Sequence, residues 1–143
     1  MLKACVIGMG PIGNNHAMIY GELPNAELAA VCDVVPERAE AGGRKHGVPF
    51  YLDAAEMLEA VKPDIVSVAT GGWEYSSDHY EPTIQALEAG AHVLCEKPIS
   101  NDIALGQKMV DTAKRLNRCF GPPLIPEALY SRPSVHKRQI LFR

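Results

Sequence analysis

The fold is decided by the stretch LKACVIGMGPIG, residues 2–13 of the chain. Residues 2–7 form an apolar run typical of a buried strand, and Gly8 to Gly13 match the pattern G-x-G-x-x-G. In this pattern the first glycine permits a tight turn, the second lets the backbone approach a pyrophosphate, and the third lets the following helix pack closely. The apolar or amphipathic side chains that follow recur at helical spacing, at Ile12, His16, Ile19 and Leu23. The stretch therefore predicts a strand, a turn and a helix.

Asp33 is the second part of the signal, because it follows Gly13 by twenty residues and ends the apolar run from Leu28 to Cys32. Alone, the glycines are a weak motif and Asp33 is a solvated carboxylate, but together at this spacing they favour dinucleotide binding. The free amides and the dipole of the helix start would bind the phosphates, where Pro11 gives up only an amide hydrogen. A carboxylate accepts hydrogen bonds from ribose hydroxyls and repels a 2′-phosphate, so NAD is favoured over NADP. Arg38 keeps NADP open, because a nearby arginine would accommodate that phosphate.

Apolar runs and helical segments alternate along the rest of the chain. Further strands are predicted at residues 48–52, 65–69 and 91–95, and further helices from Pro36 to Gly47, from Asp53 to Ala60, from Asp78 to Gly90 and from Ser100 or Asn101 to Leu116. In the last helix one face is predicted to hold Ile103, Gly106, Met109, Val110, Ala113 and Leu116. Continuous apolar strands that alternate with helices predict an α/β fold, a Rossmann-type doubly wound parallel sheet.

Composition excludes several classes of partner. The chain has 143 residues, 47% of them hydrophobic, which fits one ordinary domain, and its formal net charge is -3. No broad basic field attracts nucleic acid or anionic membranes, and no apolar run approaches the roughly 20 residues of a membrane span. Without a cleavable leader, we expect a soluble cytoplasmic protein. The four cysteines lack C-x-x-C spacing, so neither a disulfide framework nor a metal site is expected.

The segment Glu96-Lys97-Pro98, which follows Ala89-Gly90-Ala91-His92-Val93, resembles the Gfo/Idh/MocA oxidoreductases, which include glucose-fructose oxidoreductase and inositol dehydrogenases. The resemblance runs from Leu2 to about Phe120 and includes the glycine fingerprint, Asp33 and the strand that ends at Thr70. It implies hydride transfer between a sugar, inositol or related polyol and a nicotinamide cofactor. Lys97 is the implied catalytic residue, since a lysine orients a hydroxyl, stabilises negative charge and takes part in proton transfer.

The resemblance also places Glu96 at the nicotinamide ribose and makes the Lys97-Pro98 bond cis. With the residues above, the predicted cofactor-binding residues are Gly8, Gly10, Pro11, Ile12, Gly13, Asp33, Arg38, Thr70, Glu96 and Lys97.

The loop after Thr70 departs from the family pattern, which usually continues with Pro-Asn or a similar pair. Here Trp73 and Tyr75 either line the cofactor or substrate pocket or pack as a lid, and the sequence does not separate these alternatives. For His16 and His79 a partly buried, hydrogen-bonded histidine is favoured over a catalytic one.

The chain also departs from the family after Phe120. The resemblance implies a carboxyl-terminal α/β domain with an Asp/His pair, and the residues after Phe120 are expected to lack that domain. The expected division is a dinucleotide-binding domain at residues 1–120 and an irregular tail at residues 121–143, which contains Pro122, Pro123, Pro126 and Pro133. A shifted reading frame is one explanation, because codons for residues 128–132, displaced by one nucleotide, can read Arg-Phe-Thr-Pro-Ala. A truncation and a native tail are the others.

The chain alone is expected to bind cofactor but to turn over substrate poorly, because positioning groups are missing. Self-association would cover apolar surface that normally contacts a second domain, so a homo-oligomer is a further expectation. Two other functions stay open at this point. One is a stand-alone dinucleotide-binding sensor or partner subunit without catalysis. The other is a doubly wound methyltransferase or nucleotide-sugar enzyme, against which Glu96-Lys97-Pro98 argues.

Overall fold

The computed structural model describes residues 1–71 and 78–123. Trp73 and Tyr75, and the predicted tail from residue 124 onward, lie outside the described residues.

The chain forms a six-stranded sheet in which every described strand pair is parallel. The strands are β1 (Leu2–Ile7), β2 (Ala26–Cys32), β3 (Phe50–Tyr51), β4 (Ile65–Val68), β5 (His92–Cys95) and β6 (Phe120–Gly121). The helices are α1 (Pro11–Glu22), α2 (Pro36–His46), α3 (Ala54–Val61), α4 (Tyr80–Glu88) and α5 (Ile103–Arg115). The strand order β3-β2-β1-β4-β5-β6 confirms the predicted doubly wound Rossmann-type sheet.

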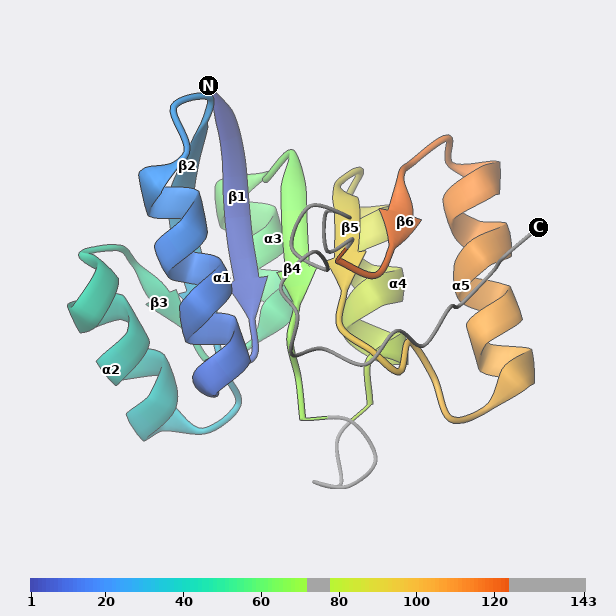
Figure 1. Cartoon of the computed structure of the whole chain (residues 1–143), viewed down its shortest axis with the longest axis horizontal. Helices are drawn as coiled ribbons and strands as arrows, with labels where there is room; N and C mark the ends of the chain where they lie inside the picture. Colours follow the sequence, from blue (N-terminus) through green and yellow to red (C-terminus); the bar gives the residue numbers. More distant parts are fainter. Residues whose placement is uncertain (72–77, 124–143) are drawn as a thin grey trace, which may run out of the picture.

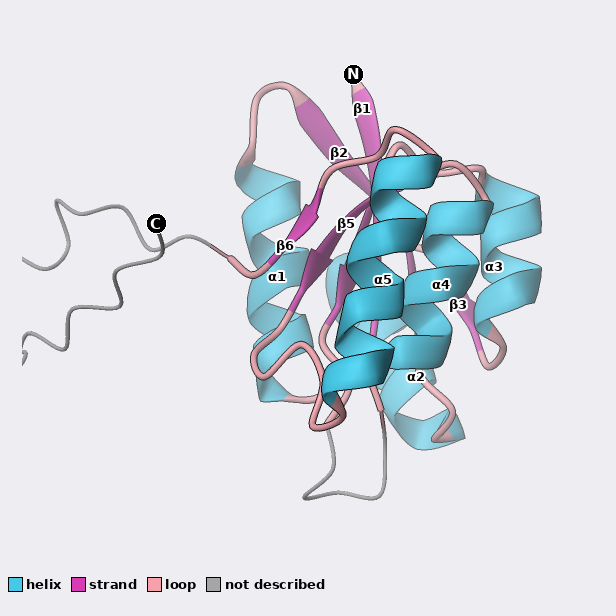
Figure 2. Cartoon of the chain, turned by 90° about the vertical axis from the view of Figure 1, so that its right-hand side faces the viewer, coloured by secondary structure: helices cyan, strands magenta, loops and turns pink. Residues whose placement is uncertain are grey.

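Helices cover both faces of this sheet (Figure 1). Figure 2 shows α1 on one side and α3, α4 and α5 on the other. The helix α2 contacts α1, β2 and β3, and α4 contacts both α3 and α5. Successive strands are added outward from β1 on one side, as β2 and β3, and outward from β4 on the other, as β5 and β6. The strand order therefore reverses between the parallel neighbours β1 and β4.

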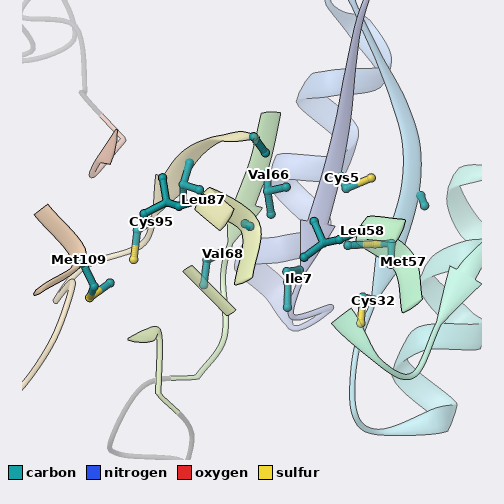
Figure 3. Close-up of a cluster of buried hydrophobic side chains, with 14 of the residues drawn as sticks. Cys5, Ile7, Cys32, Met57, Leu58, Val66, Val68, Leu87, Cys95 and Met109 are labelled. Atoms are coloured by element: carbon teal, nitrogen blue, oxygen red, sulfur yellow. The ribbon is translucent and has the colours of Figure 1, made fainter. Parts of the chain in front are cut away.

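The larger hydrophobic cluster lies between the sheet and the helices α3, α4 and α5 (Figure 3). Its largest fully buried side chains include Met57, Leu87 and Met109. Three cysteines, Cys5, Cys32 and Cys95, lie in the same cluster, and burial raises the pKa of each thiol to about 12. These cysteines behave as small hydrophobic side chains, as their apolar sequence context predicts.

Two predicted helix starts are wrong by one or two residues. Asp102, rather than Ser100 or Asn101, caps α5, because its carboxylate accepts the amide hydrogens of Ala104 and Leu105 at 2.7 and 3.1 Å. Likewise α4 begins at Tyr80 with His79 at the cap position, one residue after the predicted cap Asp78, although the carboxylate of Asp78 still accepts the amide hydrogen of Tyr80 at 3.0 Å. Several neighbouring polar residues can each cap a helix, so composition alone does not choose among them. The cap at Asp53 is confirmed by its bond to the amide of Glu56.

Two predicted helix faces also need correction. Ile103 is 93% exposed, because it is the first residue of α5 and lies before the turn that reaches the sheet. Ile12 and Ile19 of α1 and its cap residue Leu23 are exposed, whereas the buried residues of the helix are Gly13, Ala17 and Tyr20. Gly13 lies too close to the end of β1 for a side chain, and Tyr20 reaches Ser67 of β4 with its hydroxyl, so the apolar periodicity indicated the helix but not its buried face.

The sixth strand crosses the predicted domain boundary at residue 120. Phe120 and Gly121 pair in parallel with Val93 and Leu94 of β5. Gly121 therefore belongs to the sheet, and the regular structure reaches one residue further than the sequence indicated.

The packing of α5 against the core rests on Met109, which is fully buried in the larger cluster. We expect Met109→Ala to lower the free energy of unfolding by about 2–5 kcal/mol, because Met109 is fully buried in the larger cluster and its removal leaves a cavity. Ile103→Ala is the matched control on the same helix and should change that free energy by no more than ~0.5 kcal/mol. Urea unfolding followed by circular dichroism measures both, and equal losses for the two variants would contradict this placement of α5.

Candidate functional site

The predicted site residues gather at the carboxyl edge of the sheet. Gly8 follows β1, Asp33 follows β2, Thr70 lies two residues after β4, and Glu96 follows β5. In Figure 1 this edge is at the bottom of the sheet, where β1 and β4 end side by side. The crevice beyond the carboxyl ends at such a reversal of strand order is where doubly wound sheets bind ligands.

The turn from β1 into α1 is possible only with glycine at two of its positions. Gly8 has a φ of +95°, and a Cβ atom there would lie 2.6 Å from the carbonyl oxygen of Ala69. A Cβ atom on Gly13 would lie 1.7 Å from the carbonyl oxygen of Gly8. A Cβ atom on Gly10 would have no other heavy atom within 4 Å, so the space beside this residue is open. Gly8 and Gly13 thus serve the packing of the protein itself, while Gly10 leaves room for a ligand next to the backbone.

Asp33 links β2 to this glycine turn. Its carboxylate accepts the amide hydrogen of Met9 at 2.7 Å through Oδ2 and that of Val35 at 2.9 Å through Oδ1. The side chain is almost buried, with 7% of its surface exposed. Two acceptor positions of the carboxylate remain after these bonds, because each oxygen carries two lone pairs. Asp33 therefore holds the turn in place and still offers acceptors at the edge of the site.

Asn14 is a site residue that the sequence reasoning missed. Its side-chain amide donates to the carbonyl oxygens of Met9 and Gly10 at 2.9 and 3.1 Å. Its Oδ1 lies 3.2 Å from Nζ of Lys45 and 3.1 Å from Nε2 of His46. Asn14 thus turns the carbonyls of the glycine loop inward and connects α1 to the end of α2. The only sequence signal was a side-chain amide directly after the third glycine.

The segment after β5 brings Glu96, Lys97 and Pro98 to the same edge. The Lys97-Pro98 bond is cis, as the family resemblance implied. Oε2 of Glu96 accepts the amide hydrogen of Lys97 at 3.2 Å, and the side chain of Lys97 is exposed. An exposed lysine at this edge is free to contact a ligand in the crevice.

Four other predicted cofactor-binding residues lie in the loops and helix starts that follow β1, β2 and β4. Thr70 ends the β4 segment, and its hydroxyl donates to the carbonyl oxygen of Asp78 at 3.1 Å. Pro11 and Ile12 are exposed in the first turn of α1. Arg38 is exposed in the first turn of α2, and within the described residues its side chain makes no hydrogen bond. Thr70 thus lies at the carboxyl edge of the sheet, and Arg38 is an exposed residue at the start of α2.

Two further features bound the site. One surface hollow, of about 600 Å³, lies at the opposite edge, where Met18, Leu23 and Leu28 line it. The glycine turn does not line this hollow and, with open space beside Gly10, forms a ledge at the carboxyl edge. Within residues 1–71 and 78–123, no cluster of His, Cys, Asp or Glu has the arrangement of a metal site. No helix of that portion is both long and apolar enough to cross a bilayer.

Comparison with known proteins gives this geometry a family. Residues 2–122 match the model of the Gfo/Idh/MocA proteins, described as an oxidoreductase family with an NAD-binding Rossmann fold. The chain belongs to the Gfo/Idh/MocA oxidoreductase family. Its described part is the NAD-binding Rossmann domain of that family, which confirms the predicted fold and the predicted cofactor.

Curated relatives of the family are sugar and inositol dehydrogenases. D-glucoside 3-dehydrogenase of Escherichia coli (strain K12) is 40% identical over 119 residues, which cover 82% of this chain and 33% of the relative. The inositol 2-dehydrogenase/D-chiro-inositol 3-dehydrogenase of Lactiplantibacillus plantarum (strain ATCC BAA-793 / NCIMB 8826 / WCFS1) is 31% identical, with 81% of this chain and 33% of the relative covered. The chain thus spans about a third of the length of the curated relatives it matches.

A solved structure shows the same domain with cofactor. The WlbA dehydrogenase of Bordetella pertussis, in complex with NADH and UDP-GlcNAcA, superposes with a TM-score of 0.74 at 26% identity. The match covers 82% of this chain and 35% of that structure. The Gfo/Idh/MocA Rossmann domain of this chain therefore corresponds to roughly the same third of both the curated and the solved proteins.

The glycine geometry separates two variants that look alike in sequence. Gly13→Ala should abolish cooperative thermal unfolding or lower the melting temperature strongly, because its Cβ atom has no space against the backbone of Gly8. Gly10→Ala should melt within a few degrees of the unmodified chain, since open space surrounds that position. Thermal melts of the two variants check this, and the reverse order of stability would contradict the turn geometry.

Proposed function

We propose that this chain is the NAD-binding portion of an oxidoreductase that transfers hydride between a nicotinamide cofactor and a sugar, inositol or related polyol. The observation that carries the proposal is the Asp33 carboxylate, held by the amide of Met9 directly beside the open glycine turn. The turn and the start of α1 would receive the pyrophosphate, because helix amides there have no partner within the helix.

Asp33 supports NAD over NADP. Its remaining acceptors would bind the two hydroxyls of the adenosine ribose, and its charge would repel a 2′-phosphate. Arg38 is exposed in the first turn of α2, so solvent screens the attraction of its guanidinium for a 2′-phosphate. The Asp33 carboxylate is buried and fixed by two backbone hydrogen bonds, so it should decide the preference.

Lys97 is the proposed catalytic residue. When bound, nicotinamide supplies the hydride acceptor or donor. In the oxidation direction the neutral amine of Lys97 would take the proton of the reacting hydroxyl as the hydride passes to the nicotinamide, and the ammonium so formed would stabilise the negative charge on that oxygen. Glu96, fixed beside Lys97, would accept a hydrogen bond from the nicotinamide ribose.

The substrate class is proposed from the relatives. Their names specify oxidation at ring hydroxyls of glucosides and inositols. This chain spans only about a third of those relatives, so the choice among such polyols is not proposed. We propose that the chain alone binds the cofactor and turns over polyol poorly.

A selectivity titration tests the role of Asp33. The unmodified chain should bind NADH more tightly than NADPH by about tenfold or more, which corresponds to one like-charge repulsion in a partly buried site. Asp33→Asn should reduce this ratio toward one, because it removes the negative charge and keeps the shape. Calorimetric titration with both cofactors measures the ratio directly.

Asp64→Asn is the matched control. The carboxylate of Asp64 accepts the amide hydrogen of Lys3 at 2.8 Å, so it performs the same kind of backbone bond at the opposite edge of the sheet. That variant should leave the ratio unchanged. A ratio that survives Asp33→Asn, even with weaker binding of both cofactors, would show that Asp33 supports the turn without reading the ribose.

A further inference from the structure

Two histidines from distant parts of the chain contact the Glu96-Lys97-Pro98 segment. Nε2 of His16, on α1, lies 3.1 Å from Oε1 of Glu96, and the two residues are 80 positions apart in sequence. His79, at the cap position of α4, lies on the other side of the segment, with its Nδ1 2.8 Å from the carbonyl oxygen of Pro98. The segment that holds Lys97 is therefore bound at both ends by an imidazole ring.

The contact of His16 is well defined. Only 11% of the His16 side chain and 17% of the Glu96 side chain are exposed. Nδ1 of His16 is buried and has no hydrogen-bond partner among the described residues. A buried N–H group without an acceptor is costly, so the tautomer that carries its proton on Nε2 fits this site and donates that proton to Glu96. Oε2 of Glu96 accepts from the amide of Lys97, so the carboxylate is fixed through both oxygens.

His79 connects two loops rather than one. Its ring is 3% exposed, and its Nε2 lies 2.9 Å from the carbonyl oxygen of Thr70. Both neighbours are carbonyl oxygens, which only accept, so a neutral ring donates one of the two bonds and an imidazolium donates both. Thr70 and Pro98 thereby share one side chain, and the end of the β4 segment is joined to the loop after β5.

We propose that His16 and His79 are positioning residues, which together fix the Glu96-Lys97-Pro98 segment so that Glu96 and Lys97 meet the nicotinamide half of the cofactor. The inference rests on the proposed function, which assigns that half of the site to Glu96 and Lys97. A segment that is already fixed loses little conformational entropy when the cofactor binds, and it holds a flexible lysine near one place. The glycine turn and Asp33 serve the adenosine half and do not depend on these two rings.

The two halves of the cofactor provide the test. ADP lacks both the nicotinamide ring and the ribose attached to it, so it should report on the adenosine half of the site, while NADH reports on both halves. His16→Ala should weaken NADH binding roughly tenfold, the size expected for loss of one charge-assisted hydrogen bond, and leave ADP binding within about twofold. His16→Gln, whose amide nitrogen can take the place of Nε2, should restore most of the NADH affinity.

Substitutions of His79 separate its two contacts. The amide nitrogen of His79→Asn can take the place of Nδ1 and bond Pro98, whereas that of His79→Gln can take the place of Nε2 and bond Thr70. If the bond to Pro98 positions the segment, His79→Asn should keep NADH affinity and His79→Gln should weaken it roughly tenfold. His92→Asn is the control, because His92 starts β5 at the opposite edge, where its ring accepts the amide hydrogen of Cys119.

The outcomes are distinct. Selective loss of NADH binding in His16→Ala, with rescue by His16→Gln, supports the positioning role even if a His79 variant does not fold. If the unmodified chain binds both ligands but the variants lose both equally, or keep both, the positioning role is wrong and the proposed function stands. If the unmodified chain binds neither ligand, the proposed function fails, and the positioning role fails with it.

Discussion

The close approach of α1 to the end of β1 sets the geometry of this domain. The carbonyl oxygen of Gly8 occupies the place where any side chain on Gly13 would begin. Because α1 sits so near β1 at this point, its first buried positions are the small residues Gly13 and Ala17, and its first amides lie at the carboxyl edge of the sheet. The same approach puts the backbone of Met9 within reach of Asp33. One steric requirement therefore fixes both the start of the helix and the shape of the ledge that we propose as the cofactor site.

The remaining parts of the site are added to this ledge by neighbouring strands. Parallel strands end at the same edge, so the loops after β1, β2, β4 and β5 lie next to one another. Side chains then join these loops in pairs: Asp33 binds the glycine turn, His79 binds both Thr70 and Pro98, and His16 binds Glu96. Most of the polar contacts at this edge join a side chain to backbone, which holds the loops without filling the crevice.

Much of the fold was readable from sequence, because strands buried on both faces and a glycine turn leave strong local patterns. Gly8 and Gly13 could be assigned because the turn leaves no room for a side chain, and Asp33 could be assigned because a carboxylate follows the glycine pattern at a spacing of about twenty residues. Helix caps and buried faces were harder to predict, since Asp102 competes with its polar neighbours and α1 buries Gly13, Ala17 and Tyr20 instead of Ile12 and Ile19. The roles of Asn14, His16 and His79 depend on contacts between segments that the sheet brings together, and a single sequence gives no direct signal of such contacts. His16 and His79 are largely buried and hydrogen-bonded, as the sequence favoured over a catalytic role for either residue.

The most direct test of this account is a crystal structure of the chain with bound NAD. We expect the pyrophosphate beside Gly10 and the first turn of α1, the adenosine ribose hydroxyls on the Asp33 carboxylate, and the nicotinamide end near Glu96 and Lys97. That result would confirm that one ledge at the carboxyl edge of the sheet serves the whole cofactor. An adenosine ribose turned away from Asp33, or a cofactor bound at the opposite edge in the hollow beside Leu23 and Leu28, would contradict it.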